Sequence, residues 1–217
     1  MRESEGGVLS GIEGALVRAE EPLHRHTPLR VGGPAQYWAT VSDRNALAEL
    51  LKAARRERLR WRIHWPFEDW LVRDGGCNGL VIRLGGRFEG GERTEEGLLL
   101  GSAALWSYTS GIGGWGKELA HWPGSVGGLL QAGEASCLQG YPIRIRWMKG
   151  RELQSLEVTR KERLPELPKQ AILCDILIRS NRKRARGEPA RSGALFRFPR
   201  RAKPAELLRT SGLAGTR

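Results

Sequence analysis

The chain has 217 residues, of which 40% are hydrophobic and 28% are charged, and its formal net charge is +12. This length suffices for one substantial core or two small domains, and the composition excludes fibrous and disordered proteins. The longest apolar stretch, residues 98–106, is far too short to cross a bilayer, and no apolar signal core follows the N-terminus. We therefore expect a soluble protein that neither inserts into a membrane nor is exported.

The cysteine usage bears on the compartment. Cys77, Cys137 and Cys174 are far apart, odd in number and form no C-x-x-C pair. This pattern argues against a disulfide framework or a cysteine zinc site and favours a reducing cytoplasm. The four histidines also lack metal-ligand spacing, so we predict no metal site.

Most of the positive charge belongs to one segment, residues 179–203. It contains ten lysines and arginines and a single acid, Glu188, so it carries nine of the twelve net positive charges. Phe196 and Phe198 lie within it, and basic residues interleaved with aromatic ones are typical of RNA-binding tails. A solvated linker or surface strand is the favoured interpretation, because no RNA-binding motif surrounds the segment.

The first predicted elements form a strand–helix–strand unit. Residues 36–41 are rich in β-branched and aromatic side chains, which predicts a strand. Ser42 is the expected N-cap of a helix, because apolar residues recur with helical spacing over 46–54. Strands are predicted at 61–65 and 80–84, which completes the unit.

The middle of the chain is predicted to be α+β. Its strand candidates cover residues 98–100, 143–148, 153–158 and 172–178. Lys149-Gly150 is expected to form the turn of a hairpin. After Arg179 the chain becomes polar and proline-containing, which marks a boundary, and a last short helix is predicted over 205–210.

Two glycine-rich segments are candidates for ligand loops. Residues 111–116 match G-x-G-x-x-G, but no good strand leads into them and Pro123 leaves little room for a following helix, so we favour a flexible loop over a Rossmann site. Residues 123–128 read Pro-Gly-Ser-Val-Gly-Gly, which allows either a tight structural turn or a loop whose amides approach an anion. Local chemistry alone predicts no catalytic constellation.

Three segments together resemble a known family. Residues 23–35 (LHRHTPLRVGGPA) are similar to the "HTTFRxGGPA" signature of UDP-N-acetylenolpyruvoylglucosamine reductase (MurB). Residues 71–82 and 120–128 resemble its "LVRDGG-x-x-GxVI" stretch and its "AGIPGSVGG" loop. The resemblance implies an FAD-binding α+β fold with subdomains at 1–84 and 85–180, followed by a truncated remnant of the substrate domain at 181–217.

The chain departs from this family where FAD would bind. The family's "GGGSN" loop, which wraps the FAD pyrophosphate, corresponds here to residues 65–69, Trp-Pro-Phe-Glu-Asp. Bulky rings and a proline prevent close approach of the backbone, and Glu68 and Asp69 place negative charge beside a dianionic ligand. If FAD binds at all, the resemblance implies that it does so through Pro123, Gly124, Ser125, Gly127 and Gly128.

The residues of the family's chemistry are also replaced. Ala194 stands where the proton-donating serine of "SAGSxFxNP" is expected, and a methyl group cannot donate a proton. Residues 159–171 contain no counterpart of "GYRxS", the segment of the substrate-polarising arginine. The family's catalytic glutamate follows "GLxG", whereas this chain stops at residues 212–217, so we expect no catalytic residue.

These departures predict a pseudoenzyme that keeps the fold, lacks the flavin, and has a binding or structural role in peptidoglycan precursor synthesis. Its expected partners are a cell-wall enzyme or a UDP-linked precursor, and nucleic acid is not expected. One alternative is an FAD-dependent, NADPH-using UDP-N-acetylmuramate dehydrogenase. A second is anion or nucleic-acid binding through residues 179–203.

Overall fold

In the computed structural model, the residues that the structure describes are 7–66, 70–112, 119–120, 122–133, 138, 140–159, 167–168 and 170–179. The chain divides into two compact units, Met1–Gly187 and Glu188–Arg217, and all described residues belong to the first. The basic segment beyond Arg179 and the helix predicted over 205–210 lie outside the described residues.

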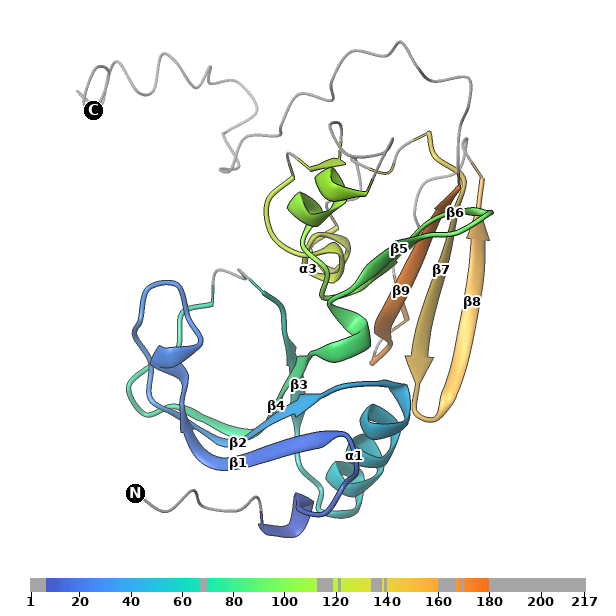
Figure 1. The fold of residues 1–217 in the computed structure, drawn as a ribbon. Coiled ribbons are helices and arrows are strands. Elements are labelled where there is room, and N and C mark those ends of the chain that lie inside the picture. Colours follow the sequence, from blue (N-terminus) through green and yellow to red (C-terminus); the bar gives the residue numbers. More distant parts are fainter. Residues whose placement is uncertain are drawn as a thin grey trace, which may run out of the picture. The chain divides into compact units, whose positions relative to one another are not determined.

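Four strands form the first sheet, in the order β1-β2-β4-β3 (Figure 1). They are β1 (Ala15–Pro22), β2 (Pro34–Val41), β3 (Trp61–His64) and β4 (Cys77–Leu84). β1 pairs antiparallel with β2, whereas β2, β4 and β3 run parallel. The predicted strands of this region are confirmed with shifted ends, and β1 has no counterpart among the predicted elements.

Helix α1 (Arg44–Arg56) connects β2 with β3 and buries one apolar face. Its buried residues are Ala46, Leu47, Leu50, Leu51 and Ala54, as the helical spacing predicts. The N-cap prediction was wrong by one residue, because the carboxylate of Asp43, not the Ser42 hydroxyl, accepts two amide hydrogen bonds of the first turn, at 2.8 and 3.0 Å. The bond from the Ala46 amide is the main cause that lowers the pKa of Asp43.

Five antiparallel strands form the second sheet, in the order β5-β6-β9-β7-β8. They are β5 (Gly91–Arg93), β6 (Gly97–Gly101), β7 (Ile143–Lys149), β8 (Glu152–Val158) and β9 (Ile172–Arg179). The predicted hairpin between β7 and β8 is confirmed, but its turn is shifted by one residue. Lys149 still pairs with Glu152, so the turn consists of Gly150 and Arg151, and Gly150 adopts the left-handed φ of 65° that favours glycine.

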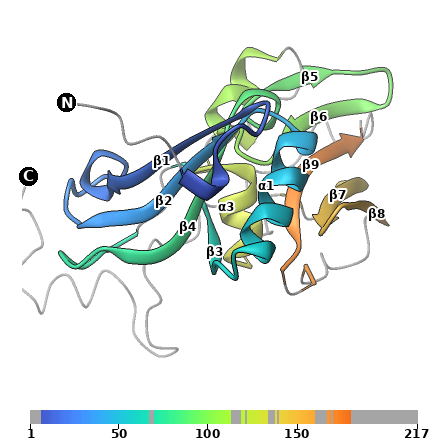
Figure 2. The ribbon, with the colours of Figure 1, turned by 90° about the horizontal axis from the view of Figure 1, so that it is seen from below.

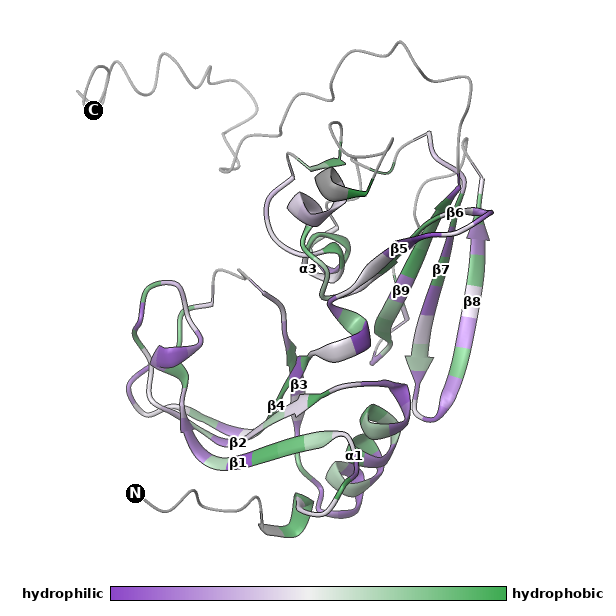
Figure 3. Cartoon of the chain, in the orientation of Figure 1, coloured by the Kyte–Doolittle hydropathy of each residue, from purple (hydrophilic) through white to green (hydrophobic). Residues whose placement is uncertain are grey.

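One continuous apolar core contains buried side chains of α1 and of both sheets. Figure 2 shows α1 next to β9, and an ion pair between Glu49 of α1 and Arg151 links the helix to the β7–β8 turn. Central β9 is apolar, whereas edge strand β8 mixes polar and apolar residues (Figure 3). A second, smaller core lies on the opposite face of the first sheet, around Trp38 and Val81.

The remaining helical segments for which the structure gives both ends are short. They are the 3-10 helices η1 (Gly7–Leu9), η2 (Leu23–Arg25), η3 (Gly86–Phe88) and η4 (Trp106–Gly111), and the α-helix α3 (Val126–Gln131). A 3-10 helix, and not a strand, therefore leads into residues 111–116, which lack the context of a dinucleotide fingerprint. Within the described residues, no helix is long and apolar enough to cross a membrane.

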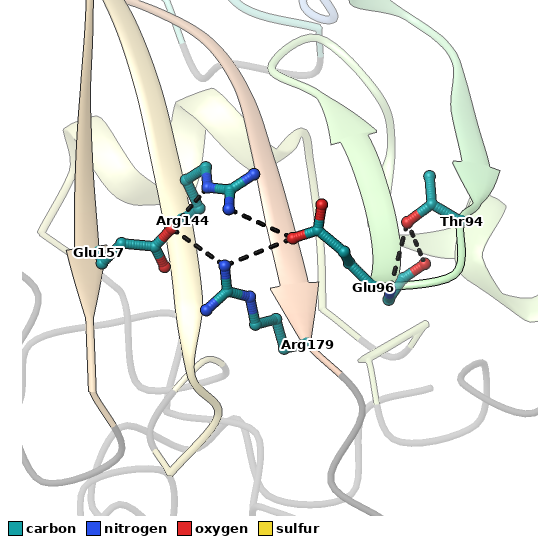
Figure 4. A network of polar contacts seen from close by, with 6 residues as sticks. Thr94, Glu96, Arg144, Glu157 and Arg179 are labelled. Carbon is teal, nitrogen blue, oxygen red and sulfur yellow. Dashed lines mark hydrogen bonds and ion pairs between the residues drawn. The ribbon is translucent and has the colours of Figure 1, made fainter.

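An ion network ties together the ends of several strands of the second sheet (Figure 4). Glu157 accepts hydrogen bonds from Arg144 at 2.5 Å and from Arg179 at 3.1 Å. Glu96, at the β5–β6 turn, contacts the same two arginines at 3.2 and 3.4 Å. The four charges cancel, so we interpret this network as a structural feature of the sheet.

Candidate functional site

The predicted loop 123–128 forms the tight entry to α3. Gly124 has a φ of 75°, and Ser125 caps the helix, with its hydroxyl accepting a hydrogen bond from the Gly128 amide at 3.2 Å. Ser125 also forms an isolated β-bridge with Leu105. The side chain of Ser125 is buried, and its hydroxyl is used by the turn itself.

The amides of this turn are bonded within the protein. The Val126 amide donates to the carbonyl of Ala104 at 2.9 Å, and the Gly127 amide donates to that of Ser102 at 2.6 Å. The Gly128 amide is held by Ser125, as described above. Three consecutive N–H groups therefore have protein acceptors, so these three donors are already used within the protein.

Trp65 lies directly against this turn. Its side chain is 3% exposed, and its indole N–H donates to the side-chain oxygen of Gln131 at 2.5 Å. A Cβ added to Gly127 would overlap the indole ring, with Cε3 at 2.8 Å, and one added to Gly128 would lie 3.4 Å from the Trp65 Cβ. The glycines of α3 therefore accommodate the indole.

A cavity of about 1280 Å³ lies beside Trp65. Its walls come from β3 with the residues before it, from α3 with the two residues after it, and from Ile145 and Leu173 of the second sheet. Residues 167, 168, 170 and 171 complete the described lining. They include Arg60, Arg62 and Trp61, but no carboxylate among the described lining residues. The cavity therefore combines aromatic and aliphatic surface with positive charge.

A second cluster was not predicted from the sequence. On the face of the first sheet opposite α1, His26 stacks on Trp38 with ring centroids 3.9 Å apart, and His64 lies 5.4 Å from Trp38 and 5.5 Å from Trp70. The Arg62 guanidinium lies 4.0 Å over the Trp70 ring. We call these five residues the ring cluster. Both histidines of the ring cluster border a cavity of about 650 Å³.

The histidines of the ring cluster form no metal site. No group of three or more potential metal-ligating side chains occurs in the part of the chain that the structure describes. His26 instead lies 2.9 Å from the carboxylate of Glu21. Burial, followed by the nearby positive charges of His26, Arg62 and Arg83, lowers the pKa of His64 to about 4.

We expect the stability of the protein to fall in acid because of His64. Its pKa is about 6.5 in the unfolded chain and about 4 in the folded one, so the unfolded state binds a proton first as the pH decreases. The stabilisation is complete above pH 6.5 and is lost as the pH falls toward 4. The free energy of unfolding, measured with urea, should fall between pH 7.5 and pH 4.5 in the wild type. In His64→Leu this fall should be smaller by roughly 2–3 kcal/mol.

The exposed His24 provides the control for this experiment. His24→Leu should keep the wild-type pH dependence, because His64 remains in place. If the free energy of unfolding of His64→Leu depended on pH as it does in the wild type, His64 would not be buried as a neutral imidazole.

The glycines of the other two motif segments have a structural role. A Cβ on Gly33 would overlap the carbonyl of Asp74, and a Cβ on Gly76 would overlap the carbonyl of Pro34. The amides of Gly33 and Gly76 both donate to the carbonyl of Arg73, at 3.0 and 2.9 Å. The loop that precedes β2 and the loop that precedes β4 are thus in backbone contact, which requires glycine without requiring a ligand.

Comparison with solved structures defines the class of fold. The crystal structure of UDP-N-acetylenolpyruvylglucosamine reductase (MurB) from Thermus caldophilus matches with a TM-score of 0.62 and 23% sequence identity, over 94% of this chain and 82% of that chain. The two sheets and their helices therefore have the α+β, FAD-binding type of fold of MurB, as the resemblance predicted. No family model matches the sequence.

Curated proteins with similar sequences are also MurB reductases. The chain is 39% identical over 120 residues to UDP-N-acetylenolpyruvoylglucosamine reductase 2 of Symbiobacterium thermophilum, over 52% of this chain and 39% of that protein. It is 35% identical over 131 residues to the reductase of Pelobacter propionicus, over 57% of this chain and 44% of that protein. The chain is thus similar in sequence to MurB reductases, and it matches about two fifths of the length of these relatives.

The predicted site residues can now be placed. The structure brings Pro123, Gly124, Ser125, Gly127 and Gly128 together in one turn and places Trp65 against it. Phe67, Glu68 and Asp69, and the position of Ala194, lie outside the described residues, as do residues 212–217 and most of 159–171. FAD binding through the turn, and the subdomain limits at residues 84 and 180, remain predictions.

Proposed function

We propose that this chain is a flavin-free member of the MurB family that binds a partner and does not reduce a substrate. The observation that carries the proposal is the position of Trp65. Its indole occupies the glycine surface of α3, and its N–H is bonded to Gln131. In the family this residue position belongs to the loop that the resemblance assigns to the FAD pyrophosphate.

The residues present do not fit a diphosphate at this position. Three amides of the turn have protein acceptors, and the indole covers Gly127. Exposing a tryptophan side chain of about 150–250 Å² costs roughly 4–6 kcal/mol, and the Gln131 hydrogen bond would be lost as well. A flavin dinucleotide would have to offset this cost before it gained any binding energy.

The sequence departures support the absence of catalysis. A methyl group at Ala194 cannot donate the proton that the family's reaction needs, and no Gly-Tyr-Arg segment occurs in residues 159–171. The retained glycines, by contrast, are those that the two loops and α3 need for packing. We propose a docking role in peptidoglycan precursor synthesis, toward a cell-wall enzyme or a UDP-linked precursor.

The enzyme alternative predicts that the chain oxidises NADPH, whereas our proposal predicts that it does not. In the presence of FAD and enolpyruvyl-UDP-N-acetylglucosamine, NADPH oxidation by the purified chain should not exceed the rate of a protein-free control. A full-length reductase of the family provides the positive control in the same assay. Turnover that depends on this chain would contradict the proposal.

Nucleic-acid binding through residues 179–203 is the other alternative. It requires binding that weakens steeply with salt concentration, because phosphate contacts release counterions. Within the described residues, Arg179 is paired with Glu96 and Glu157, so the first basic residue of the segment belongs to the ion network. We therefore propose the docking role ahead of this one.

A further inference from the structure

Strand β3 forms an open edge of the first sheet, and the large cavity runs along it. Among the strands that the structure describes, β3 has one neighbour, β4, on one side only. Residues 59–63 all line the cavity. Because successive side chains of a strand point to opposite faces, five consecutive residues line one cavity only if it lies along the backbone edge.

The backbone groups that point to this edge can be assigned from the pairing register. The Leu80 amide donates to the Arg60 carbonyl at 2.8 Å, and Trp61 is paired with Leu80 in a parallel ladder. The groups of Arg60 and Arg62 therefore face β4, and those of Trp61 and Ile63 face the cavity. Within the described chain, no backbone hydrogen bond joins Trp61 or Ile63 to another segment.

The walls around this edge indicate what could pair with it. Trp61 and Leu130 contribute apolar surface, and Gln131 lies on the facing helix α3. Arg60 contributes positive charge, and the described lining contains no carboxylate. An acidic and apolar segment therefore complements the cavity.

We propose that the cavity docks an extended peptide segment of a partner protein, with alternating acidic and apolar residues, which adds to the open edge of β3 as a fifth strand. Exposed strand edges template this kind of pairing, in which main-chain hydrogen bonds provide affinity and side-chain pockets provide specificity. The inference deepens the proposed docking role. It rests on the flavin-free proposal, because a dinucleotide bound in the cavity would contact the same residues as the peptide.

The test uses the full chain and a fluorescein-labelled hexapeptide of alternating glutamate and valine. Fluorescence anisotropy should show saturable binding, and a lysine–valine hexapeptide should not bind. A glutamate–valine peptide that is N-methylated at every residue should bind at least roughly tenfold more weakly, which corresponds to about 1.4 kcal/mol, because neither of its edges can donate to the strand edge. Equal binding of the N-methylated peptide would overturn strand addition.

Amide hydrogen exchange locates the peptide. The Trp61 and Ile63 amides should exchange quickly in the free protein and be protected at least tenfold by the peptide, as expected for newly formed main-chain bonds. The Arg62 amide should be protected in both states, because it is bonded to β4. Binding that leaves the Trp61 and Ile63 amides unprotected would contradict the proposal.

A charge-reversal pair tests the electrostatic part. Arg60→Glu should weaken peptide binding roughly tenfold, or about 1.4 kcal/mol. Arg55→Glu makes the same charge change at an exposed position of α1 outside the cavity, and it should leave the affinity within about twofold. Equal effects of the two variants would show that only net charge matters and would overturn the site.

Two titrations separate this inference from the proposed function. Uridine monophosphate should not displace the peptide. If it does displace the peptide, and the peptide does not protect the Trp61 and Ile63 amides, the occupant of the cavity is a nucleotide and the peptide proposal is wrong. FAD uptake by the same sample would contradict the flavin-free proposal. Absence of both FAD and peptide binding would overturn only the peptide site.

Discussion

Gly76→Ala should lower the free energy of unfolding by at least about 3 kcal/mol, the largest effect that we expect from a single methyl group in this chain. Gly76 has a φ of 71°, in the left-handed region, and an added Cβ would overlap the carbonyl of Pro34. Strain at a left-handed residue alone costs about 1–3 kcal/mol, and separating the two loops adds to it. Urea unfolding followed by circular dichroism measures the difference.

The neighbouring Gly75 is the matched control. A Cβ at Gly75 would meet no atom within 4 Å, and its φ is not in the left-handed region. Gly75→Ala should therefore change stability by less than about 0.5 kcal/mol. If both variants had the same small effect, the backbone contact between the two loops would not be the reason for the glycine motif.

Trp65→Ala should destabilise the protein by about 3–5 kcal/mol, the usual cost of truncating a buried tryptophan. The indole is 3% exposed, packs on Gly127 and is bonded to Gln131. The measurement also bears on function, because it gives the cost of removing the indole from the site where a diphosphate would lie. Urea unfolding at neutral pH provides it.

Trp65→Phe separates the ring from its hydrogen bond. It keeps an aromatic ring against Gly127 and removes the donor to Gln131, so the expected loss is about 1–2 kcal/mol. A loss below about 1 kcal/mol in Trp65→Ala would show that the indole moves aside easily, and the steric argument against flavin would then fail.

Much of the fold follows from local patterns in the sequence. The helical spacing over residues 46–54 predicts α1, and apolar runs predict the central strands β4 and β9, because these elements bury whole faces. Strand β1 was missed because it is an edge strand with charged residues and half-buried positions in place of a clean alternation. The cap was misplaced because Ser42 and Asp43 are both good caps, and only the backbone geometry selects between them.

The candidate site was predictable only in part. The turn 123–128 is visible as a motif, but the contact of Trp65 with Gly127 joins residues far apart in the sequence and depends on how the two sheets pack. The ring cluster was missed for the same reason, since its members come from β2, β3 and two loops. The spacing of the histidines bears only on metal binding, whereas the tryptophans in the same part of the sequence as His64 are the signal that could indicate the ring cluster.

The most direct test of the central claim is whether the purified chain retains flavin. The protein should be incubated with excess FAD, desalted, and examined for the visible absorption band of bound flavin, with a full-length reductase of the family as the positive control. We predict a colourless protein, because Trp65 covers Gly127 and three amides of the turn are already bonded within the protein. A yellow protein with one flavin per chain would contradict the account.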